Sequence, residues 1–339
     1  MAGQVSQRLA AGLLIGLLLA VLAGCGGDGA PKSEDAAGSQ PGKPLTAGTC
    51  WDAEHLPDVL GQHRFDAWVE QYAGGSEVLG QSMRDDAAYD RPFACDEPHT
   101  LEIFDVVSLE PALLARVTSY ADLLDESSPL YARVRDQVID RCFARSPYGV
   151  AQRKAGGLPV QLSPSENPDG GLSGGWDPVP ADRWVRGEKK FLCLFEQDRP
   201  GTVRFADITT SRYPLAARVC IDVPAKEVPC AGPHQAENIA GMVLNTAVES
   251  GRLPGRTAIR SATNGRYVAL SGRDQARLDQ VCQTFLEAVS TAQRGLTAAA
   301  YVADADEWPG KDGLYNATCY ALEPGDPPPM MNGSVFDRG

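Results

Sequence analysis

The chain has 339 residues, 44 acidic side chains against 31 basic ones, and a formal net charge of −13. This balance argues against nucleic acid as a partner and against electrostatic attraction to an anionic membrane surface, because both need basic patches. The length is enough for two ordinary domains of about 100–200 residues each.

Residues 1–24 predict a signal peptide. An apolar, uncharged run from Leu9 to Gly24 follows Arg8 and is short for a bilayer span of ~20 residues. Its end, Leu-Ala-Gly-Cys at residues 22–25, resembles a bacterial lipobox. The resemblance implies cleavage before Cys25 and a diacylglyceryl group on its sulfur, which would anchor the protein to the extracytoplasmic face of the cell membrane. The alternative is an ordinary secretory signal or a single-pass anchor with an incidental cysteine.

Residues 25–48 are rich in Gly, Pro and Ser, which indicates a flexible tether. Beyond Cys25 the chain keeps an even number of cysteines, and in an exported protein such a set predicts disulfides. They are Cys50, Cys95, Cys142, Cys193, Cys220, Cys230, Cys282 and Cys319. None forms a Cys-x-x-Cys pair, so the spacing favours neither a zinc site nor a thioredoxin-type redox centre.

The string Cys-x-x-Pro-His-x-x-Glu occurs twice, and we call it the PHxxE motif. Its residues are Pro98, His99 and Glu102 after Cys95, and Pro233, His234 and Glu237 after Cys230. An amphipathic helix follows each copy and carries one cysteine on its apolar stripe. A tryptophan then precedes a short strand with the last cysteine, Trp184 in the first copy and Trp308 in the second.

This order predicts an α+β fold of two tandem, disulfide-stapled repeats, each a small, mainly antiparallel sheet packed against an amphipathic helix. We place the repeats at residues 49–198 and 216–323. Eight cysteines allow 105 pairings, whereas two self-contained sets of four allow three each. If the terminal strand lies under the helix, the helix cysteine pairs with the strand cysteine. The favoured pairs are therefore Cys142–Cys193 and Cys282–Cys319, which leaves Cys50–Cys95 and Cys220–Cys230.

Three segments depart from this plan. The stretch between the first two cysteines is far longer in the first copy, and this insertion, residues 51–94, carries apolar and helix-like sequence. We predict that the insertion packs as an additional structural element. A binding surface specific to this protein would lie on it. Residues 163–184 are dense in Pro, Gly, Ser and Asp and predict an irregular surface loop. Residues 324–339 predict a disordered tail.

The PHxxE motif has a structural and a functional interpretation. The residues after His99 are β-branched and partly alternating, which indicates a strand, and residues three apart in a strand point to opposite faces. A metal site or catalytic pair within one copy is thus disfavoured, and zinc would need three or four ligands. We favour a structural joint, in which the proline holds the preceding residue extended and the histidine binds backbone groups at the strand entry. No catalytic residue, metal or cofactor is predicted.

Two other sequence patterns each have a functional and a structural interpretation. A Gly-x-Ser-x-Gly match at residues 171–175 lacks the preceding strand and following helix of a nucleophile elbow, so we interpret it as chance in a Gly-rich loop. Trp176 and Trp184 are predicted to cover the disulfide-rich core, with a platform for wall glycans as the alternative.

Together, the PHxxE motif, the helix cysteine, Trp-x-x-Gly and the closing cysteine resemble the septum-formation domain family of actinobacterial envelope proteins. The first copy matches throughout, including Gly187 and Cys193, whereas Trp308-Pro309-Gly310 in the second departs from the spacing. The resemblance implies a place outside the cytoplasmic membrane and brings no catalytic residues. We therefore predict a non-enzymatic lipoprotein that binds another envelope or division protein. A wall-glycan-binding module and a wall or lipid hydrolase are the alternatives.

Overall fold

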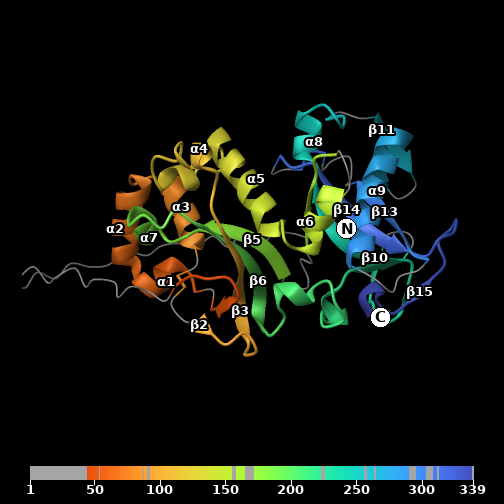
Figure 1. Ribbon diagram of the computed structural model, residues 1–339, viewed down its shortest axis with the longest axis horizontal. Coiled ribbons are helices and arrows are strands. Elements are labelled where there is room, and N and C mark those ends of the chain that lie inside the picture. The colour runs from red at the N-terminus through yellow and green to blue at the C-terminus, as the bar shows by residue number, and fades with distance from the viewer. Residues whose placement is uncertain are drawn as a thin grey trace, which may run out of the picture. The chain divides into compact units, whose positions relative to one another are not determined.

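The computed structural model describes most of the chain from residue 44 onward. The described residues are 44–52, 54–86, 88–89, 92–154, 158–164, 172–222, 226–255, 258–262, 265–289, 295–302, 308–310 and 313–337. The predicted signal peptide, Cys25 and most of the tether lie outside them. Residues 44–339 form one unit (Figure 1). None of the helices in these ranges has the length and apolarity needed to cross a bilayer.

The first half contains a five-stranded antiparallel sheet in the order β2-β1-β3-β6-β5. The strands are β1 (Thr49–Trp51), β2 (Pro92–Phe93), β3 (His99–Val107), β5 (Leu172–Pro178) and β6 (Phe191–Gly201). Helix α5 (Pro129–Phe143) lies against it, with Val134, Val138 and Cys142 buried. The helix begins at Pro129 because the hydroxyl of Ser128 accepts hydrogen bonds from two backbone amides of its first turn.

The insertion forms three helices, so the prediction that it packs as an ordered element is confirmed. They are α1 (Leu56–Leu60), α2 (Gln62–Ala73) and α3 (Glu77–Asp85). Phe65 and Met83 are 1% and 0% exposed, and the ring of Tyr89 meets Trp51 of β1 edge-on at 5.9 Å. Helices α2 and α3 approach closely at Gly80, where an added Cβ would lie 2.8 Å from Val69. The insertion is thus part of the core of the first half.

The second half contains a further antiparallel sheet in the order β13-β14-β10-β7-β8. Its strands are β7 (Cys220–Asp222), β8 (Lys226–Val228), β10 (Ala236–Val243), β13 (Thr297–Val302) and β14 (Asn316–Leu322), and helix α9 (Gly272–Val289) packs on it. The predicted α+β class with antiparallel sheets is therefore confirmed. The other helices and strands are α4 (Pro111–Leu114), α6 (Pro147–Lys154), α7 (Ala181–Val185), α8 (Asn245–Glu249), β4 (Gln161–Ser163), β9 (Pro233–His234), β11 (Ala258–Ala262), β12 (Gly265–Ala269) and β15 (Met331–Asn332).

The two halves share structure across their boundary. Strand β4 comes from the first half of the chain but pairs with β10, where Leu162 lies opposite Met242. Helix α6 packs against α9, and the rings of Tyr148 and Phe285 stack at 4.8 Å. Both rings are buried, so this contact removes apolar surface from water and joins the halves through side chains as well as backbone.

All four favoured disulfide pairs are confirmed. Cys142 of α5 joins Cys193 of β6, and Cys282 of α9 joins Cys319 of β14, with Cα separations of 5.4 and 5.2 Å. The pairs Cys50–Cys95 and Cys220–Cys230 each have a Cα separation of 5.2 Å. In each half one bond therefore ties the helix to the sheet and the other ties the first strand to the PHxxE motif.

The expectation of an irregular loop over residues 163–184 is wrong for residues 172–184, and residues 165–171 lie outside the described residues. Strand β5 occupies Leu172–Pro178 and pairs along its whole length with β6, and α7 follows it. Pairing with a central strand overrides the weak β propensity of Gly and Pro, and β5 is an edge strand, where a proline is tolerated. Trp184 is 1% exposed and packs against Phe191 at 5.5 Å, so it lies in the core as predicted and not on a surface platform.

The expectation of a disordered tail is also wrong. Strand β15 pairs with β9, and the short 3-10 turn η5 (Val335–Asp337) follows it. Met331 and Val335 are each 1% exposed. Two apolar residues that find a place in the core, together with polar contacts to Glu237 described below, order this segment despite its many prolines and glycines.

Candidate functional site

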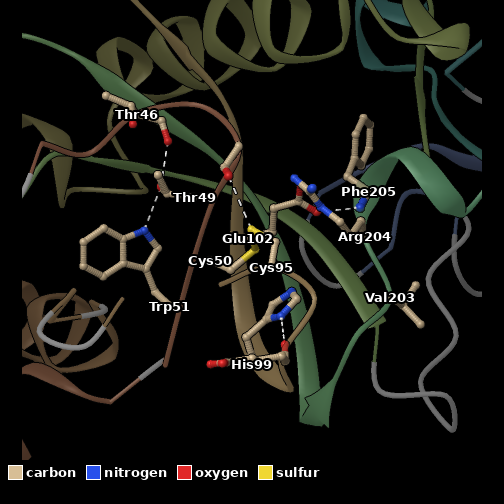
Figure 2. Close-up of a disulfide and its surroundings, with 12 residues drawn as sticks. Thr46, Thr49, Cys50, Trp51, Cys95, His99, Glu102, Val203, Arg204 and Phe205 are labelled. Atoms are coloured by element: carbon tan, nitrogen blue, oxygen red, sulfur yellow. Dashed lines mark hydrogen bonds and ion pairs between the residues drawn. A yellow bond between two sulfur atoms is a disulfide. The ribbon is translucent and has the colours of Figure 1, made fainter. Parts of the chain in front are cut away.

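The first PHxxE motif lies at the start of β3, where Figure 2 shows its side chains beside the Cys50–Cys95 disulfide. The His99 Nδ1 donates to the carbonyl of Glu97 at 2.8 Å. Glu102 is 3% exposed, and its Oε1 accepts from Nε and Nη2 of Arg204 at 3.1 and 2.7 Å. The backbone N–H of Phe205 donates to the other carboxylate oxygen at 2.7 Å. The glutamate thus holds the chain that follows β6 against β3.

The second motif makes the same kinds of bond. The His234 Nδ1 donates to a backbone carbonyl at 2.9 Å, that of Gly232. Glu237 accepts from the Ser334 hydroxyl at 2.7 Å, from the Val335 N–H at 2.6 Å and from Nη1 of Arg218 at 3.4 Å. This carboxylate thereby anchors the tail to β10, as Glu102 anchors the segment after β6.

The prediction that His and Glu point to opposite faces is wrong in the second copy, where potential ligand atoms of His234 and Glu237 lie within 4.8 Å of one another. His99 is 1% exposed and Glu102 3%, and His234 and Glu237 are both 0% exposed. In the first copy the extra residues of the register shift between His99 and Leu101 lie on β6, and β1 pairs regularly with Leu101–Ile103, so the alternation along β3 is not reset. In the second copy β9 ends at His234 and β10 begins two residues later, so alternation along a single strand does not relate His234 to Glu237.

The second motif also brings three potential ligand atoms together. Atoms of Cys220, His234 and Glu237 lie within 4.8 Å of one another. The sulfur of Cys220 is bonded to Cys230, so it offers no thiolate, and Glu237 already binds a guanidinium. As folded, this set offers a metal ion little beyond one imidazole nitrogen, which is short of the three or four ligands of a zinc site.

The polar groups of the two motifs are mostly used inside the protein. Both glutamates accept a backbone N–H at the start of a short 3-10 turn, η2 (Phe205–Asp207) or η5. The exceptions are Nε2 of His99 and of His234, which are buried and have no hydrogen-bond partner among the residues that the structure describes. The arrangement fits the structural interpretation of the motif. Pro98 and Pro233 are exposed at the strand entries.

The remaining sequence patterns lie apart from the motifs. Residues 172–175 of the Gly-x-Ser-x-Gly match belong to β5, so Ser173 lies on an extended edge strand and not on the strand-to-helix turn of a nucleophile elbow. Trp308 is half-buried and meets Tyr315 edge-on at 5.0 Å. Neither feature offers a converging set of catalytic groups.

A concavity, which we call the insertion cleft, lies between the insertion and the sheet. Its volume is about 750 Å³. Helix α3, the segment after the turn η1 (Ala121–Leu123), the start of α5 and the end of β5 form its walls. Its lining residues are Glu77, Val78, Gln81, Ser82, Asp86, Leu123, Leu124, Glu126, Tyr131, Trp176, Asp177 and Pro178. The insertion connects β1 with β2 at one edge of the sheet and reaches β5 at the other edge, where the Tyr89 hydroxyl donates to Asp177 at 3.4 Å.

The electrostatics of the insertion cleft are dominated by carboxylates. Burial, and then the charge of Glu196, raise the pKa of Asp177 from its ordinary 3.8 to about 7, which a hydrogen bond from the Tyr89 hydroxyl at 3.4 Å partly opposes. Burial also raises the pKa of Glu196 itself. Tyr131, which also lines the cleft, has its pKa raised to about 12 by burial and by Glu126. A carboxyl that exchanges its proton near neutral pH therefore faces the cleft.

This shift predicts a pH-dependent stability. Because the folded-state pKa of Asp177 lies above its unfolded value, the native protein loses stability as pH rises from about 4 to about 7. Asp177→Asn removes this loss, so its Tm should exceed that of the parent at pH 8 by more than at pH 5. Thermal unfolding at both pH values measures the difference, with Glu77→Gln in the same cleft as the control. A gap that is equal or larger at pH 5 would contradict the assignment.

Several of these residues carry no sequence signal. Arg204, Arg218 and Ser334 lie outside both motifs, and Asp177 lies in the segment expected to be irregular. One weak signal exists: Arg-Phe-Ala-Asp at 204–207 and Ser-Val-Phe-Asp at 334–337 each follow the last strand of a half. The two segments therefore occupy similar positions in the two halves, after the closing cysteine of each.

Two features therefore bear on function: the paired motifs, whose polar groups mostly bind the protein itself, and the insertion cleft, which is lined by several carboxyl groups. No family model, no curated protein and no solved structure matches this chain. The function has to be argued from the chemistry of these two features.

Proposed function

We propose that this protein is a non-enzymatic, lipid-anchored interaction module at the extracytoplasmic face of the cell membrane, associated with septum formation or the cell envelope. The observation that carries the proposal is that the insertion, which the second half lacks, builds an open cleft on a disulfide-stapled scaffold. Four disulfides support an oxidising compartment, since a reducing cytosol would open them. The lipid on Cys25 would supply the membrane attachment that the net charge of −13 cannot.

We further propose that the two halves are tandem copies of one plan. The strand order β2-β1-β3-β6-β5 in the first half has the counterpart β8-β7-β10-β14-β13 in the second. A helix-to-strand disulfide and a first-strand disulfide recur in each. On this proposal the insertion between β1 and β2 replaces the short β7–β8 connection. The second half then represents the scaffold without the cleft.

A wall-glycan hydrolase is the second candidate function. It is favoured by Asp177, a carboxyl with a pKa raised to about 7 in the same cleft as Glu126, since glycoside hydrolysis uses a pair of carboxyl groups of which one is a protonated acid. Incubation with purified cell wall, followed by measurement of released reducing ends, tests it. Release that Asp177→Asn abolishes would replace the non-enzymatic proposal.

The lipid anchor and the place of action are tested in cells. Full-length protein with a C-terminal tag should fractionate with membranes and gather at the septum of dividing cells of its native host. Cys25→Ala should lose the lipid and leave the membrane fraction, whereas a control change in the tether, Ser33→Ala, should alter neither. Mass spectrometry of the mature N-terminus checks the lipid. An unmodified Cys25 would refute the anchor, and an even distribution around the envelope would refute the link to septation.

A further inference from the structure

The insertion cleft has the size and the wall composition of a ligand site. Its volume of about 750 Å³ lies within the range of roughly 300–1,000 Å³ that is typical of small-ligand pockets. Leu123, Leu124 and Pro178 provide apolar walls, and Val78 at the rim is 76% exposed, a large exposed fraction for an apolar side chain. A concave surface with apolar and polar walls can bind the apolar stem of a ligand as well as its polar end.

The charge of the cleft has one sign. Its carboxylates come from separate segments: Glu77 from α3, Asp86 from just beyond it, Glu126 from the chain before α5 and Asp177 from β5. The described lining contains no Lys, Arg or His, and none of the ion pairs between described residues involves Glu77, Glu126 or Asp177. Carboxylates along the walls of a low-dielectric cleft concentrate cations within it.

The spacing of these groups argues against a metal ion. Within the described ranges, three or more potential ligand residues converge only at Cys220, His234 and Glu237, which are not part of the cleft. An inner-sphere calcium or zinc site needs several ligand atoms around one point. Carboxylates spread over opposite walls suit a larger cation whose charge is carried on an organic group.

Aromatic rings give the cleft a second means of binding such a cation. Trp176 and Tyr131 both line it, and their ring centroids lie 5.6 Å apart. An ammonium or guanidinium group over the face of such a ring is attracted by the ring's electrons, more strongly as water is excluded. The cleft lining thus offers a cation both carboxyl groups and aromatic rings.

We propose that the insertion cleft binds an organic cation, a primary ammonium or guanidinium group carried on an apolar stem. The ion pairs would form with Asp177 and Glu126, the ring contact with Trp176, and the stem would pack on Leu123 and Leu124. A Lys or Arg side chain of a partner protein and a free polyamine both present this group. The proposal rests on the proposed function in treating the insertion as the binding surface, but it concerns the ligand and not the place of action.

The test is calorimetric titration of the full-length protein in an uncharged detergent. The probes are N-acetyl-leucyl-arginine amide, its neutral isostere N-acetyl-leucyl-citrulline amide, spermidine and Ca²⁺ alone. The arginine dipeptide should bind at least tenfold more tightly than the citrulline dipeptide. Tighter binding of the dipeptide than of spermidine would point to a partner's basic segment, and the reverse would point to a free polyamine, and both results support the cation site.

Variants assign the binding to the cleft. Asp177→Asn and Glu126→Gln should each weaken binding of the arginine dipeptide about tenfold, which corresponds to about 1.4 kcal/mol. Glu287→Gln, an exposed carboxylate on α9, should leave it unchanged. Unaltered affinity in both cleft variants, equal affinity for the two dipeptides, or Ca²⁺ binding that displaces the dipeptide would each overturn the proposal. Because the measurement uses purified protein, its failure would leave the lipid anchor and septal position untouched.

Discussion

Glu237→Ala should lower the free energy of unfolding by about 3–5 kcal/mol, the range expected when one member of a buried ion pair is removed. The side chains of Glu237 and Arg218 are 0% and 1% exposed. Without the carboxylate, the buried guanidinium loses its ion pair with Glu237, although it still donates to the carbonyls of Thr210 and Tyr213. The N–H of Val335 and the hydroxyl of Ser334 lose an acceptor as well, so the tail should detach.

The first motif offers a matched control for this prediction. Glu102→Ala removes the same bond type, but the side chain of Arg204 is 37% exposed and can take water in place of the carboxylate. The expected loss is about 1–3 kcal/mol, closer to that of a single charged hydrogen bond. Chemical denaturation of both variants with the disulfides intact measures the difference. Equal losses in the two variants would show that burial of the arginine does not set the strength of this joint.

Both arginines come from the same segment, the connection between the end of β6 and the start of β7. Arg204 near its beginning pairs with Glu102 of the first half, and Arg218 near its end pairs with Glu237 of the second. Each half therefore holds one end of the connection through the glutamate of its own PHxxE motif. Together with β4 on β10 and Tyr148 on Phe285, these pairs explain why residues 44–339 form one unit in which the halves are not separate bodies.

The parts of the fold that the sequence predicts are those with a local signal. The apolar stripes of α5 and α9 place Cys142 and Cys282 on the buried side, and this constraint, with two sets of four cysteines, selects the pairs that the structure contains. The length of the stretch between Cys50 and Cys95 and its apolar residues predict an ordered insertion. Periodicity and spacing are enough for such features because they depend on neighbours a few residues apart.

The rest depends on contacts between distant parts of the chain. Glu102 meets Arg204 at a sequence separation of 102 residues, and Glu237 meets Ser334 at a separation of 97. No sequence motif around Arg204, Arg218 or Ser334 predicts that the residue binds a glutamate of the PHxxE motifs. The ordered tail likewise owes its structure to a strand that is remote in sequence, and strand β5 owes its structure to pairing with β6. The insertion cleft combines α3 of the insertion with three further segments, so the sequence could indicate only the insertion itself.

The disulfide between α5 and β6 should stabilise the native protein more than the Cys220–Cys230 bond of the second half. In the chain-entropy description, a bond that closes 51 residues stabilises the native state by about 4 kcal/mol, and one that closes 10 residues by about 3 kcal/mol. The double change Cys142→Ala, Cys193→Ala should therefore lower the free energy of unfolding more than Cys220→Ala, Cys230→Ala.

The comparison is well matched because all four sulfur-bearing residues are at most 3% exposed, so the cavity left by each pair of substitutions is similar. Denaturant unfolding of the two double variants at equal protein concentration gives the difference. A greater loss from the Cys220–Cys230 pair would contradict the entropic account. It would indicate that this bond acts in the native state, by holding β7 and the PHxxE strand in the register that brings Glu237 to Arg218, so that the joint and the disulfide form one cooperative unit.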